Sequence, residues 1–454
     1  MTVSNRHTSY VLWCSFVVAL GGLLFGFDTA VVSGAVEDLR SVFVLNSFEL
    51  GFTVAVALIG TIFGALIFGK PADWYGRRTM LFVIGLLYLI SAIGSGAAWD
   101  WYSFVFFRFI GGLGVGGASV LSPMYIAEIA PAKYRGRLVA LTQFNIVFGI
   151  LLAFFSNYII KVIDIGNVDW RLMFGIEALP AAAFLLLLFA VPQSPRWLIS
   201  KQRVDEAKSI LLKLGSDNDN LDVVVSEISS SLDIKHHSLR ERFLQRKYAV
   251  PISLAVAIAM FNQLSGINAI LYYAPSIFMS AGAGSNAAFL QAVAIGFVNL
   301  IFTMLALLVI DFLGRRTLML VGSIGYIVSL ATVATAFFTY SADFTPTGNM
   351  IVLISLFVFI AAHAFGQGAV IWVFISEIFP NRVRARGQSL GAFTHWIMAA
   401  LISWTFPLIA EFSGGIIFAF YTVMMVLQLI WVIFIMPETK GIPLEQIQKK
   451  LGVS

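Results

Sequence analysis

The sequence predicts an all-α integral membrane protein, with twelve transmembrane helices in two six-helix bundles and a cytoplasmic helical insert between them. The 454 residues are 59% hydrophobic and only 12% charged, whereas soluble domains carry roughly 25% charged residues. The apolar residues form continuous runs, and ~20 such residues cross the ~30 Å of a bilayer's hydrocarbon core. Continuous runs without alternation indicate helices, since only helices and closed barrels satisfy their backbone in lipid.

The apolar runs give the order of the elements. The first run carries Asp28 and is too long for the apolar part of a signal peptide, so we expect it to be a span. The twelve expected spans lie near 10–34, 48–69, 79–97, 101–122, 138–160, 172–191, 249–279, 287–310, 317–340, 349–376, 388–410 and 415–436. The predicted domains are an N-terminal bundle (1–191), a cytoplasmic linker with short helices (192–248), a C-terminal bundle (249–436) and a cytoplasmic tail (437–454).

Lysine and arginine set the predicted orientation. They gather in alternate short loops, at 70–78, 133–137, 315–316 and 382–386, and such loops face the cytoplasm. Both termini and the central insert are then cytoplasmic. The net charge of +5 is explained by these loops and is no sign of nucleic-acid binding. The single cysteine, Cys14, excludes a disulfide within the chain, and we expect no metal or cofactor.

Two motifs are written twice, once in each half. The first is Asp73-x-x-Gly76-Arg77-Arg78, which recurs as Asp311-x-x-Gly314-Arg315-Arg316 after the second span of the second half. The second is an acid followed by arginine, with Glu128 before Arg135 and Glu377 before Arg384. Parallel repeats of six spans imply two similar bundles with a site at their interface near the membrane midplane.

The charged residues of these motifs are predicted to form a cytoplasmic gate. An acid at a helix end and an arginine nearby attract strongly only where water is scarce, so such pairs hold helix ends together in one state and part in another. The alternative is that the arginines only anchor the topology. The expected gate residues are Asp73, Arg77, Arg78, Glu128, Arg135, Asp311, Arg315, Arg316, Glu377 and Arg384.

With these motifs, the chain resembles the sugar porter family of the major facilitator superfamily over nearly its whole length. Further motifs carry the resemblance: Pro192-Gln-Ser-Pro195-Arg196, Gln263-Leu-Ser-Gly266-Ile-Asn268 with Tyr272-Tyr273, and Pro437-Glu-Thr-Lys-Gly441. The closest pattern is that of bacterial sugar–proton symporters of the xylose and glucose type. The resemblance implies the major facilitator fold and secondary active transport of a monosaccharide, hexose or pentose, with a proton by alternating access.

Some positions depart from the pattern of the family. The family usually has Glu where Gln193 stands, which implies a weaker ion-pair network on that face. Asn262 stands where many members have Gln. Ile150 replaces a Gln of some proton-coupled members, as in facilitative carriers, and His395 replaces a Gln or Asn.

An acid and a base lie inside the expected spans. A charge at the bilayer centre costs on the order of 2.5–3.5 kcal/mol, so an intramembrane ionisable residue is a functional candidate. At 1.5 Å per residue, Asp28 lies about 9 Å and Arg108 about 10 Å below the same surface, so the two are level. The resemblance implies that they are the proton-coupling pair. The alternative is a static ion pair, and Glu177 either joins the coupling or braces a loop arginine.

A sugar site needs amides, which donate and accept hydrogen bonds without charge, and aromatic faces. Gln263, Asn268 and Tyr272 cannot share one face of a straight helix, so Ser265-Gly266 and Pro275 predict a broken span seven. The resemblance implies these sugar-binding residues: Gln143, Asn262, Gln263, Asn268, Tyr272, Tyr273, Asn299, Gly368, Trp372, His395 and Trp396. We expect Gly368 to let a sugar approach the backbone.

Several of these positions have a plainer interpretation. Asn299 would also serve as an interhelical hydrogen-bonding residue, and Trp372 would serve as lipid-facing or core packing. His395 bonds a sugar hydroxyl, titrates, or caps a polar neighbour.

Other functions remain as alternatives. Ile150 favours a facilitative uniporter and Asp28 opposes it. A sugar sensor of the same fold usually carries long soluble tails, which this sequence does not show, and five scattered histidines offer no catalytic cluster, so we expect no enzyme. The expected partners are a monosaccharide, a proton and the bilayer of the inner (cytoplasmic) membrane, with no nucleic acid, and the chain is expected to be a monomer.

Overall fold

The computed structural model is built of helices, and the residues it describes contain no strand. It describes residues 3–131, 134–215, 221–238, 243–340, 343–380, 382–442, 446–447, 449 and 451–452. The side chains of residues 3–8, 135, 231–238 and 311 fall outside this description. The predicted all-α membrane fold is confirmed.

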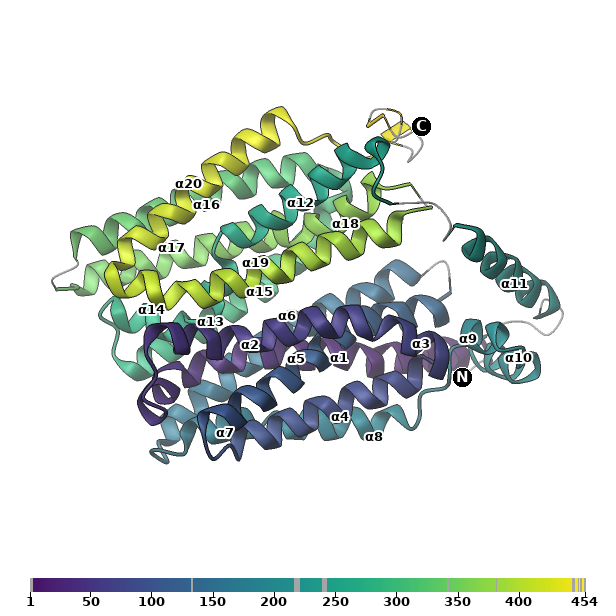
Figure 1. The fold of residues 1–454 in the computed structure, drawn as a ribbon, viewed down its shortest axis with the longest axis horizontal. Helices are drawn as coiled ribbons and strands as arrows, with labels where there is room; N and C mark the ends of the chain where they lie inside the picture. Colours follow the sequence, from purple (N-terminus) through teal and green to yellow (C-terminus); the bar gives the residue numbers. More distant parts are fainter. Residues whose placement is uncertain are drawn as a thin grey trace. The chain divides into compact units, whose positions relative to one another are not determined.

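The first half of the chain folds into helices that follow the expected spans, with short helices at the turns (Figure 1). Its helices are α1 (Val3–Val42), α2 (Ser47–Ile67), α3 (Gly69–Tyr75), α4 (Arg77–Gly96), α5 (Trp101–Ile129), α6 (Arg135–Ile163), α7 (Asp169–Gly175) and α8 (Ala178–Leu188). The insert adds α9 (Pro195–Ser200), α10 (Val204–Lys213), α11 (Leu221–Ser238) and the short helix η2 (Arg246–Tyr248). The insert is therefore helical, as predicted.

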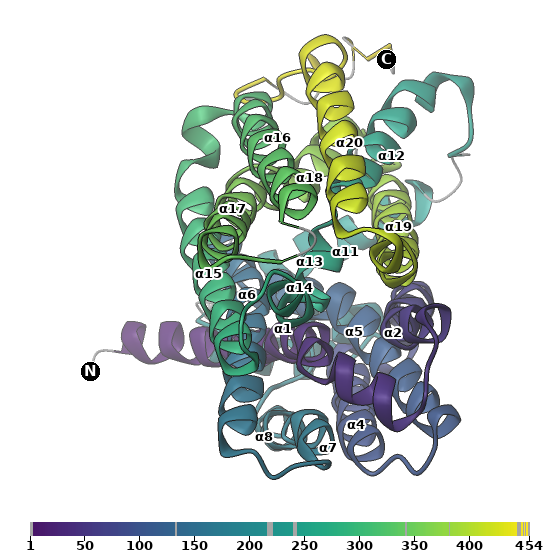
Figure 2. The same cartoon turned by 90° about the vertical axis from the view of Figure 1, so that its left-hand side faces the viewer.

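The second half repeats this pattern. Its helices are α12 (Ala249–Leu264), α13 (Ile267–Tyr272), α14 (Ala274–Ser280), α15 (Ser285–Leu313), α16 (Arg315–Thr339), α17 (Pro346–Phe365), α18 (Gln367–Ile378), α19 (Arg384–Phe412) and α20 (Gly414–Phe434). Helix α16 packs beside α17 and α20, and α12 packs beside α19 (Figure 2). Among the described residues, twelve helical segments are long and apolar enough to cross a membrane.

Three spans are broken. In span seven, Gly266 takes a positive φ of 84° between α12 and α13, which only glycine adopts at little cost. Pro275 then opens α14 one residue after Tyr273. The predicted break is thus present. The break at Gly366 in span ten and the break between α7 and α8 beside Glu177 were not expected from the sequence.

Contacts between Cα atoms divide the chain into two compact units. Unit 1 comprises Met1–Thr29, Ile59–Ile150 and Phe174–Arg240, and unit 2 comprises Ala30–Leu58, Leu151–Met173 and Glu241–Ser454. Unit 2 therefore includes one end of α1 and of α2. There Trp404 of α19 donates its indole N–H to the carbonyl of Phe48 at 3.2 Å, and Ser276 of α14 donates to Glu37 at 2.9 Å. The domains predicted from the sequence are continuous stretches of the chain, whereas these units are not. The predicted domain boundaries stay a prediction.

Glycines allow the helices of unit 1 to approach backbone to backbone. A Cβ atom at Gly116 of α5 would lie 2.2 Å from the carbonyl oxygen of Thr61 in α2. A Cβ at Gly149 of α6 would lie 2.1 Å from the carbonyl oxygen of Leu23 in α1. Gly116, in the glycine-rich run 111–117, therefore serves helix packing.

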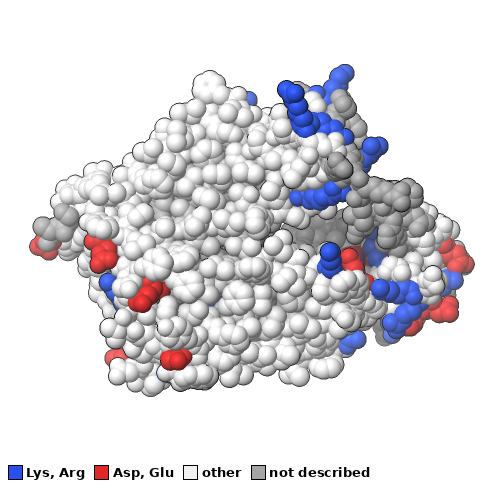
Figure 3. Space-filling view, in the orientation of Figure 1, with Lys and Arg blue, Asp and Glu red and all other residues white. Residues whose placement is uncertain are grey.

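The polar residues lie mostly at the helix ends. Figure 3 shows Lys and Arg side chains near α3 and α10 in unit 1 and near the C-terminal end of α20 in unit 2, while the surface along the helices carries few charges.

Where the chain enters α5, Asp100 accepts a hydrogen bond from the Ser103 backbone N–H at 2.8 Å, which lowers the pKa of its carboxyl group. This capping fixes the start of the helix.

We predict that Gly149→Ala destabilises the fold, because its methyl group would collide with the backbone of α1. Overpacking of this kind costs about 1–3 kcal/mol. Thermal unfolding of the purified protein in detergent measures the effect. The matched control is Gly136→Ala on the same helix, where a Cβ meets nothing within 4 Å. Equal unfolding temperatures for both variants would contradict the role of Gly149.

Candidate functional site

Unit 1 contains a cluster of three buried charged residues. Asp28 comes from α1, Arg108 from α5, and Glu177 from the break between α7 and α8. Their exposed fractions are 1%, 2% and 1%. Buried charges are rare unless they are paired, so the cluster is the strongest candidate for function in the unit.

Asp28 and Arg108 form an ion pair. Arg108 Nη1 lies 2.5 Å from Asp28 Oδ1, and Nη2 donates to the Asp28 backbone carbonyl at 3.1 Å and to Oδ2 at 3.4 Å. The guanidinium also lies over the ring of Phe174, 5.0 Å from its centroid. Gly111 makes room for the carboxyl group, since a Cβ there would lie 3.2 Å from Asp28 Oδ1. The structure thus brings together the pair that the depth argument placed level.

Glu177 faces the same pair. Its carboxyl group is close enough to Asp28 and Arg108 to interact with both electrostatically. No N–H or O–H group of the described residues donates to either Glu177 oxygen. Two carboxyl groups share a hydrogen bond only when one of them carries a proton, because an ionised carboxylate is only an acceptor.

Unit 2 gathers amides and aromatic rings from α12, α18 and α19. Gln263 donates from Nε2 to Asn262 Oδ1 at 3.0 Å, and the same nitrogen lies 3.2 Å from His395 Nε2. The rings of Trp372 and Trp396 pack against His395, with centroids 5.2 and 4.8 Å away. Gln263 Oε1 is buried without a donor among the described residues, which leaves an acceptor for a ligand hydroxyl.

The other predicted sugar-binding residues are placed differently. Tyr273 is buried, and its hydroxyl donates to the Ser403 carbonyl at 3.0 Å, so it ties the break in span seven to α19. Asn299 accepts from Thr303 of its own helix at 3.4 Å. Asn268 is half-buried and Tyr272 is buried, both on α13. Gln143 is half-buried on α6 and belongs to unit 1.

Gly368 lies beside His363. A Cβ atom at this position would lie 3.1 Å from the His363 carbonyl oxygen and 3.3 Å from its ring atom Nε2. The missing side chain therefore makes room for His363, and the expected approach of a sugar to the backbone at Gly368 stays a prediction.

Two polar groups of unit 2 escaped the sequence analysis. His363 Nδ1 lies 2.5 Å from the hydroxyl of Tyr326. Gln428 donates to Ser323 at 2.8 Å and accepts from Gln367. Both groups consist of polar residues inside expected spans. Their position in a span would have been enough to mark them as functional candidates.

The repeated motif contacts the fourth and the sixth span of its half in both units. In unit 1, Arg77 bridges two acids, with 3.0 Å from Nη1 to Asp73 Oδ1 and 3.0 Å from Nη2 to Glu128 Oε1. Arg78 donates to the carbonyls of Leu188 and Phe189 at 3.2 and 2.9 Å. These carbonyls close α8, and the last carbonyls of a helix lack partners within it.

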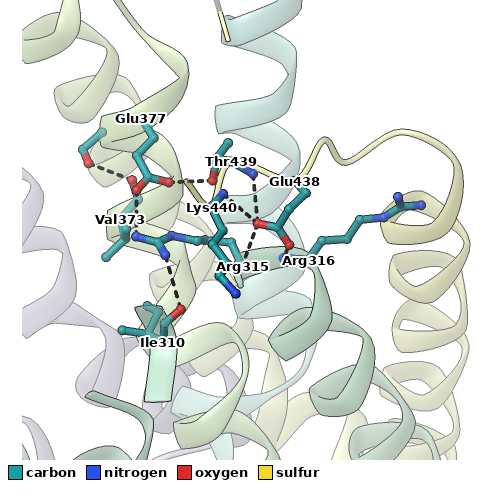
Figure 4. Close-up of polar contacts among 9 residues, drawn as sticks. Ile310, Arg315, Arg316, Val373, Glu377, Glu438, Thr439 and Lys440 are labelled. Atoms are coloured by element: carbon teal, nitrogen blue, oxygen red, sulfur yellow. Dashed lines mark hydrogen bonds and ion pairs between the residues drawn. The ribbon is translucent and has the colours of Figure 1, made fainter. Parts of the chain in front are cut away.

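Unit 2 repeats the contact between the first arginine and the acid of the fourth span, as Figure 4 shows. Arg315 Nη2 lies 2.8 Å from Glu377 Oε1, whose other oxygen accepts from Thr439 at 2.6 Å. Arg316 donates to the carbonyls of Val432, at 3.1 Å, and Ile433. The first arginine of each motif therefore binds the acid of the fourth span, and the second caps the sixth.

In each unit, a residue that follows a proline accepts a backbone N–H group at the start of the helix opened by Gly-Arg-Arg. This residue is Gln193, after Pro192, in unit 1 and Glu438, after Pro437, in unit 2. In unit 2, the Glu438 carboxylate accepts from the backbone N–H groups of Arg315 and Arg316, both at 3.0 Å (Figure 4). In unit 1, Gln193 Oε1 accepts from Arg78 N at 3.3 Å and its Nε2 donates to Thr79 at 3.2 Å. A helix N-terminus favours a negative charge, so the neutral amide binds α4 more weakly.

The remaining gate residues are only partly described. Arg384 is half-buried, and its Nε and Nη2 have no acceptor among the described residues. The side chains of Arg135 and Asp311 lie outside the described part of the structure.

Comparison with known proteins gives a consistent result. A family model described as "Sugar (and other) transporter" matches residues 14–451. The D-xylose-proton symporter of Escherichia coli (strain K12) is 40% identical, over 98% of this chain and 96% of that protein. The arabinose-proton symporter of Bacillus subtilis (strain 168) is 34% identical, over 98% and 96%.

Solved structures agree with the sequences. The inward open conformation of the xylose transporter XylE from E. coli matches with a TM-score of 0.85 and 37% identity, over 97% of this chain and 99% of that chain. Its partially occluded inward open conformation matches with a TM-score of 0.84. The fold expected from the resemblance is therefore confirmed.

We predict that exchanging the two capping residues changes stability in opposite directions. Glu438→Gln removes a charged acceptor from the start of α16, and Gln193→Glu adds one at the start of α4. Hydrogen bonds to charged groups exceed neutral ones by roughly 1 kcal/mol, so the first variant unfolds at a lower temperature and the second at a higher one. Thermal unfolding in detergent measures both. A loss of stability in both variants would contradict the equivalence of the two positions.

Proposed function

The chain belongs to the sugar transporter family, and from this premise we propose that it carries a monosaccharide, a pentose or hexose, across the membrane together with a proton. It works by alternating access, as a monomer. Its relatives include symporters named for D-xylose and for arabinose.

The charge of the cluster in unit 1 carries the proposal. Asp28 and Glu177 are two acids beside one base, Arg108, and all three are almost fully buried. With both acids ionised the cluster holds one uncompensated negative charge, which is expensive away from water. Binding one proton makes it neutral and supplies the hydrogen bond between the two carboxyl groups. The cluster thus has a place for one proton.

The proton then controls the pairing of Arg108. When Asp28 is protonated, its attraction for Arg108 weakens and the protein adopts the outward-open state that binds sugar. When the proton leaves on the cytoplasmic side, the pair of Asp28 and Arg108 reforms and sugar affinity falls. In this structure the pair is closed at 2.5 Å.

The polar residues of unit 2 bind the sugar. Gln263 offers its unpartnered oxygen to a hydroxyl, Asn262 and His395 hold its amide in place, and Trp372 offers a ring face. Trp372 is 39% exposed although it lies within span ten, which leaves its face open to a ligand. Tyr273 serves by positioning the break in span seven.

The repeated motifs form the cytoplasmic gate. The supporting observation is that Arg77 of α4 joins Glu128 of α5, and Arg315 of α16 joins Glu377 of α18, so each pair holds two helix ends together within its unit. With the basic loops inside, both termini face the cytoplasm and the chain lies in the inner membrane. Arg384, with two buried nitrogens unused, is available to an acid in another state.

We predict that Asp28→Asn abolishes uphill accumulation but keeps sugar exchange. Asparagine resembles the protonated acid and takes up no proton, so the pH gradient no longer drives transport. A gradient of one pH unit supplies about 1.4 kcal/mol, enough for roughly tenfold accumulation with one proton per sugar. Uptake and counterflow of labelled sugar in proteoliposomes, with and without the gradient, measure the two activities.

Asp164→Asn is the matched control, since Asp164 is exposed in a loop and should keep full accumulation. If Asp28→Asn accumulated sugar as the unmodified protein does, the coupling role would be refuted. If the unmodified protein exchanged sugar without accumulating it, the protein would be a uniporter.

We also predict that Glu177→Gln uncouples transport. The glutamine amide would donate to Asp28 without a proton, and the cluster would be neutral with only Asp28 and Arg108 charged. Counterflow should persist while gradient-driven accumulation is lost, measured in the same vesicles. If Glu177 were only a brace, the variant would lose thermal stability and keep its coupling.

A further inference from the structure

His363 is an ionisable residue at the middle of a membrane span that the proposed mechanism does not use. It lies in the last turns of α17, about 25 Å from the start of span ten at Pro346 and about 22 Å from its end at Ile378, at 1.5 Å per residue. A polar residue at this depth is a functional candidate.

Its ring is held from one side. The Tyr326 hydroxyl lies 2.5 Å from His363 Nδ1, and Tyr326 itself is fully buried against Phe359, with ring centroids 5.1 Å apart. Nδ1 is thereby occupied and the ring orientation is fixed, which leaves Nε2 for another partner.

His363 Nε2 lies on the side of the ring that faces the cluster of Gln263, Trp372 and His395. Nε2 and Cδ2 sit over Gly368, each 3.3 Å from where a Cβ atom would be. Gly368 precedes Trp372 by one helical turn, and the Trp372 ring packs on His395 at 5.2 Å. His363 and His395 are also close enough to interact electrostatically. His363 therefore belongs to the same wall as His395.

His363 is partly exposed. Gly368, beside its Nε2 atom, is also half-buried, whereas Tyr326, beside its Nδ1 atom, is fully buried. No hydrogen bond from Nε2 to the described residues is seen. A polar atom in such a position gains by meeting a ligand hydroxyl.

We propose that His363, oriented by Tyr326, hydrogen-bonds one hydroxyl of the bound sugar through Nε2 and so helps to set sugar specificity. The inference rests on the proposed sugar transport. A neutral imidazole nitrogen either donates or accepts a hydrogen bond, and a sugar hydroxyl can pair with it in both cases. Tyr326 acts as a positioning residue, since it fixes the ring and does not meet the sugar.

The test pairs ring variants with sugars that lack one hydroxyl. Half-saturation concentrations are measured by counterflow in proteoliposomes for the best-transported sugar and for each of its monodeoxy analogues. In the unmodified protein, one analogue should bind about tenfold more weakly than the parent because its partner nitrogen is left unpaired. In His363→Phe, the parent sugar should weaken about tenfold and that one analogue should bind as well as the parent.

Further variants separate contact from packing. His363→Gln restores a hydrogen-bonding group and should recover part of the discrimination. Tyr326→Phe leaves the ring in place but frees it, and should reduce the same discrimination, whereas Tyr340→Phe at the end of α16 should not. These variants keep the test decisive if His363→Phe fails to fold.

Two results would overturn the proposal. A uniform weakening of the parent and all analogues, in His363→Phe or in His363→Gln, would make His363 a structural residue. Unchanged discrimination in every variant would place it outside the site. Uptake by the unmodified protein in the same vesicles reports separately on the proposed function: if no sugar is transported, both proposals fail, and if sugar is transported, only the analogue comparison decides about His363.

Discussion

The structure of unit 1 depends on how the charges of its buried acids and arginine are balanced within the membrane-spanning helices. Asp28, Arg108 and Glu177 lie on three different segments, and none of them reaches water. Two acids and one base carry a net negative charge when both acids are ionised, and one added proton would balance it. The proposed proton coupling rests on this imbalance, which the helices α1 and α5 and the α7–α8 break bring together.

The repeated motifs supply partners for backbone carbonyls at helix ends, which lack partners within their own helix. Each Gly-Arg-Arg sequence turns the chain with a positive φ at glycine, 95° at Gly76 and 89° at Gly314. The first arginine then joins the fourth span of its half and the second satisfies the last carbonyls of the sixth. One short motif thus binds three helices together in each half. This explains why the same residues recur at the same spacing, and why the bundle corners are similar although the surrounding residues differ.

Much of the fold was predictable because lipid leaves few choices: span number, helix type and the break at Gly266 all follow from apolar length and glycine. The level placement of Asp28 and Arg108 was predictable from helical rise alone. Individual side-chain contacts could not be predicted. His363, five residues before Gly368 in the chain, folds back over it through the break at Gly366. The Tyr273 hydroxyl donates to a backbone carbonyl of α19. Neither partner is visible in a pattern of residues.

The unequal caps of α4 and α16 have a consequence for the two halves. The amide of Gln193 carries no charge, whereas the carboxylate of Glu438 brings a negative charge to the start of α16. Glu438 also receives the backbone N–H groups of Thr439 and Lys440, both at 2.9 Å. Glu438 therefore receives four backbone N–H groups at one corner of the second half, whereas Gln193 receives one at the matching corner of the first half. A molecule built from two copies of one plan thus holds the start of this helix more firmly in its second half.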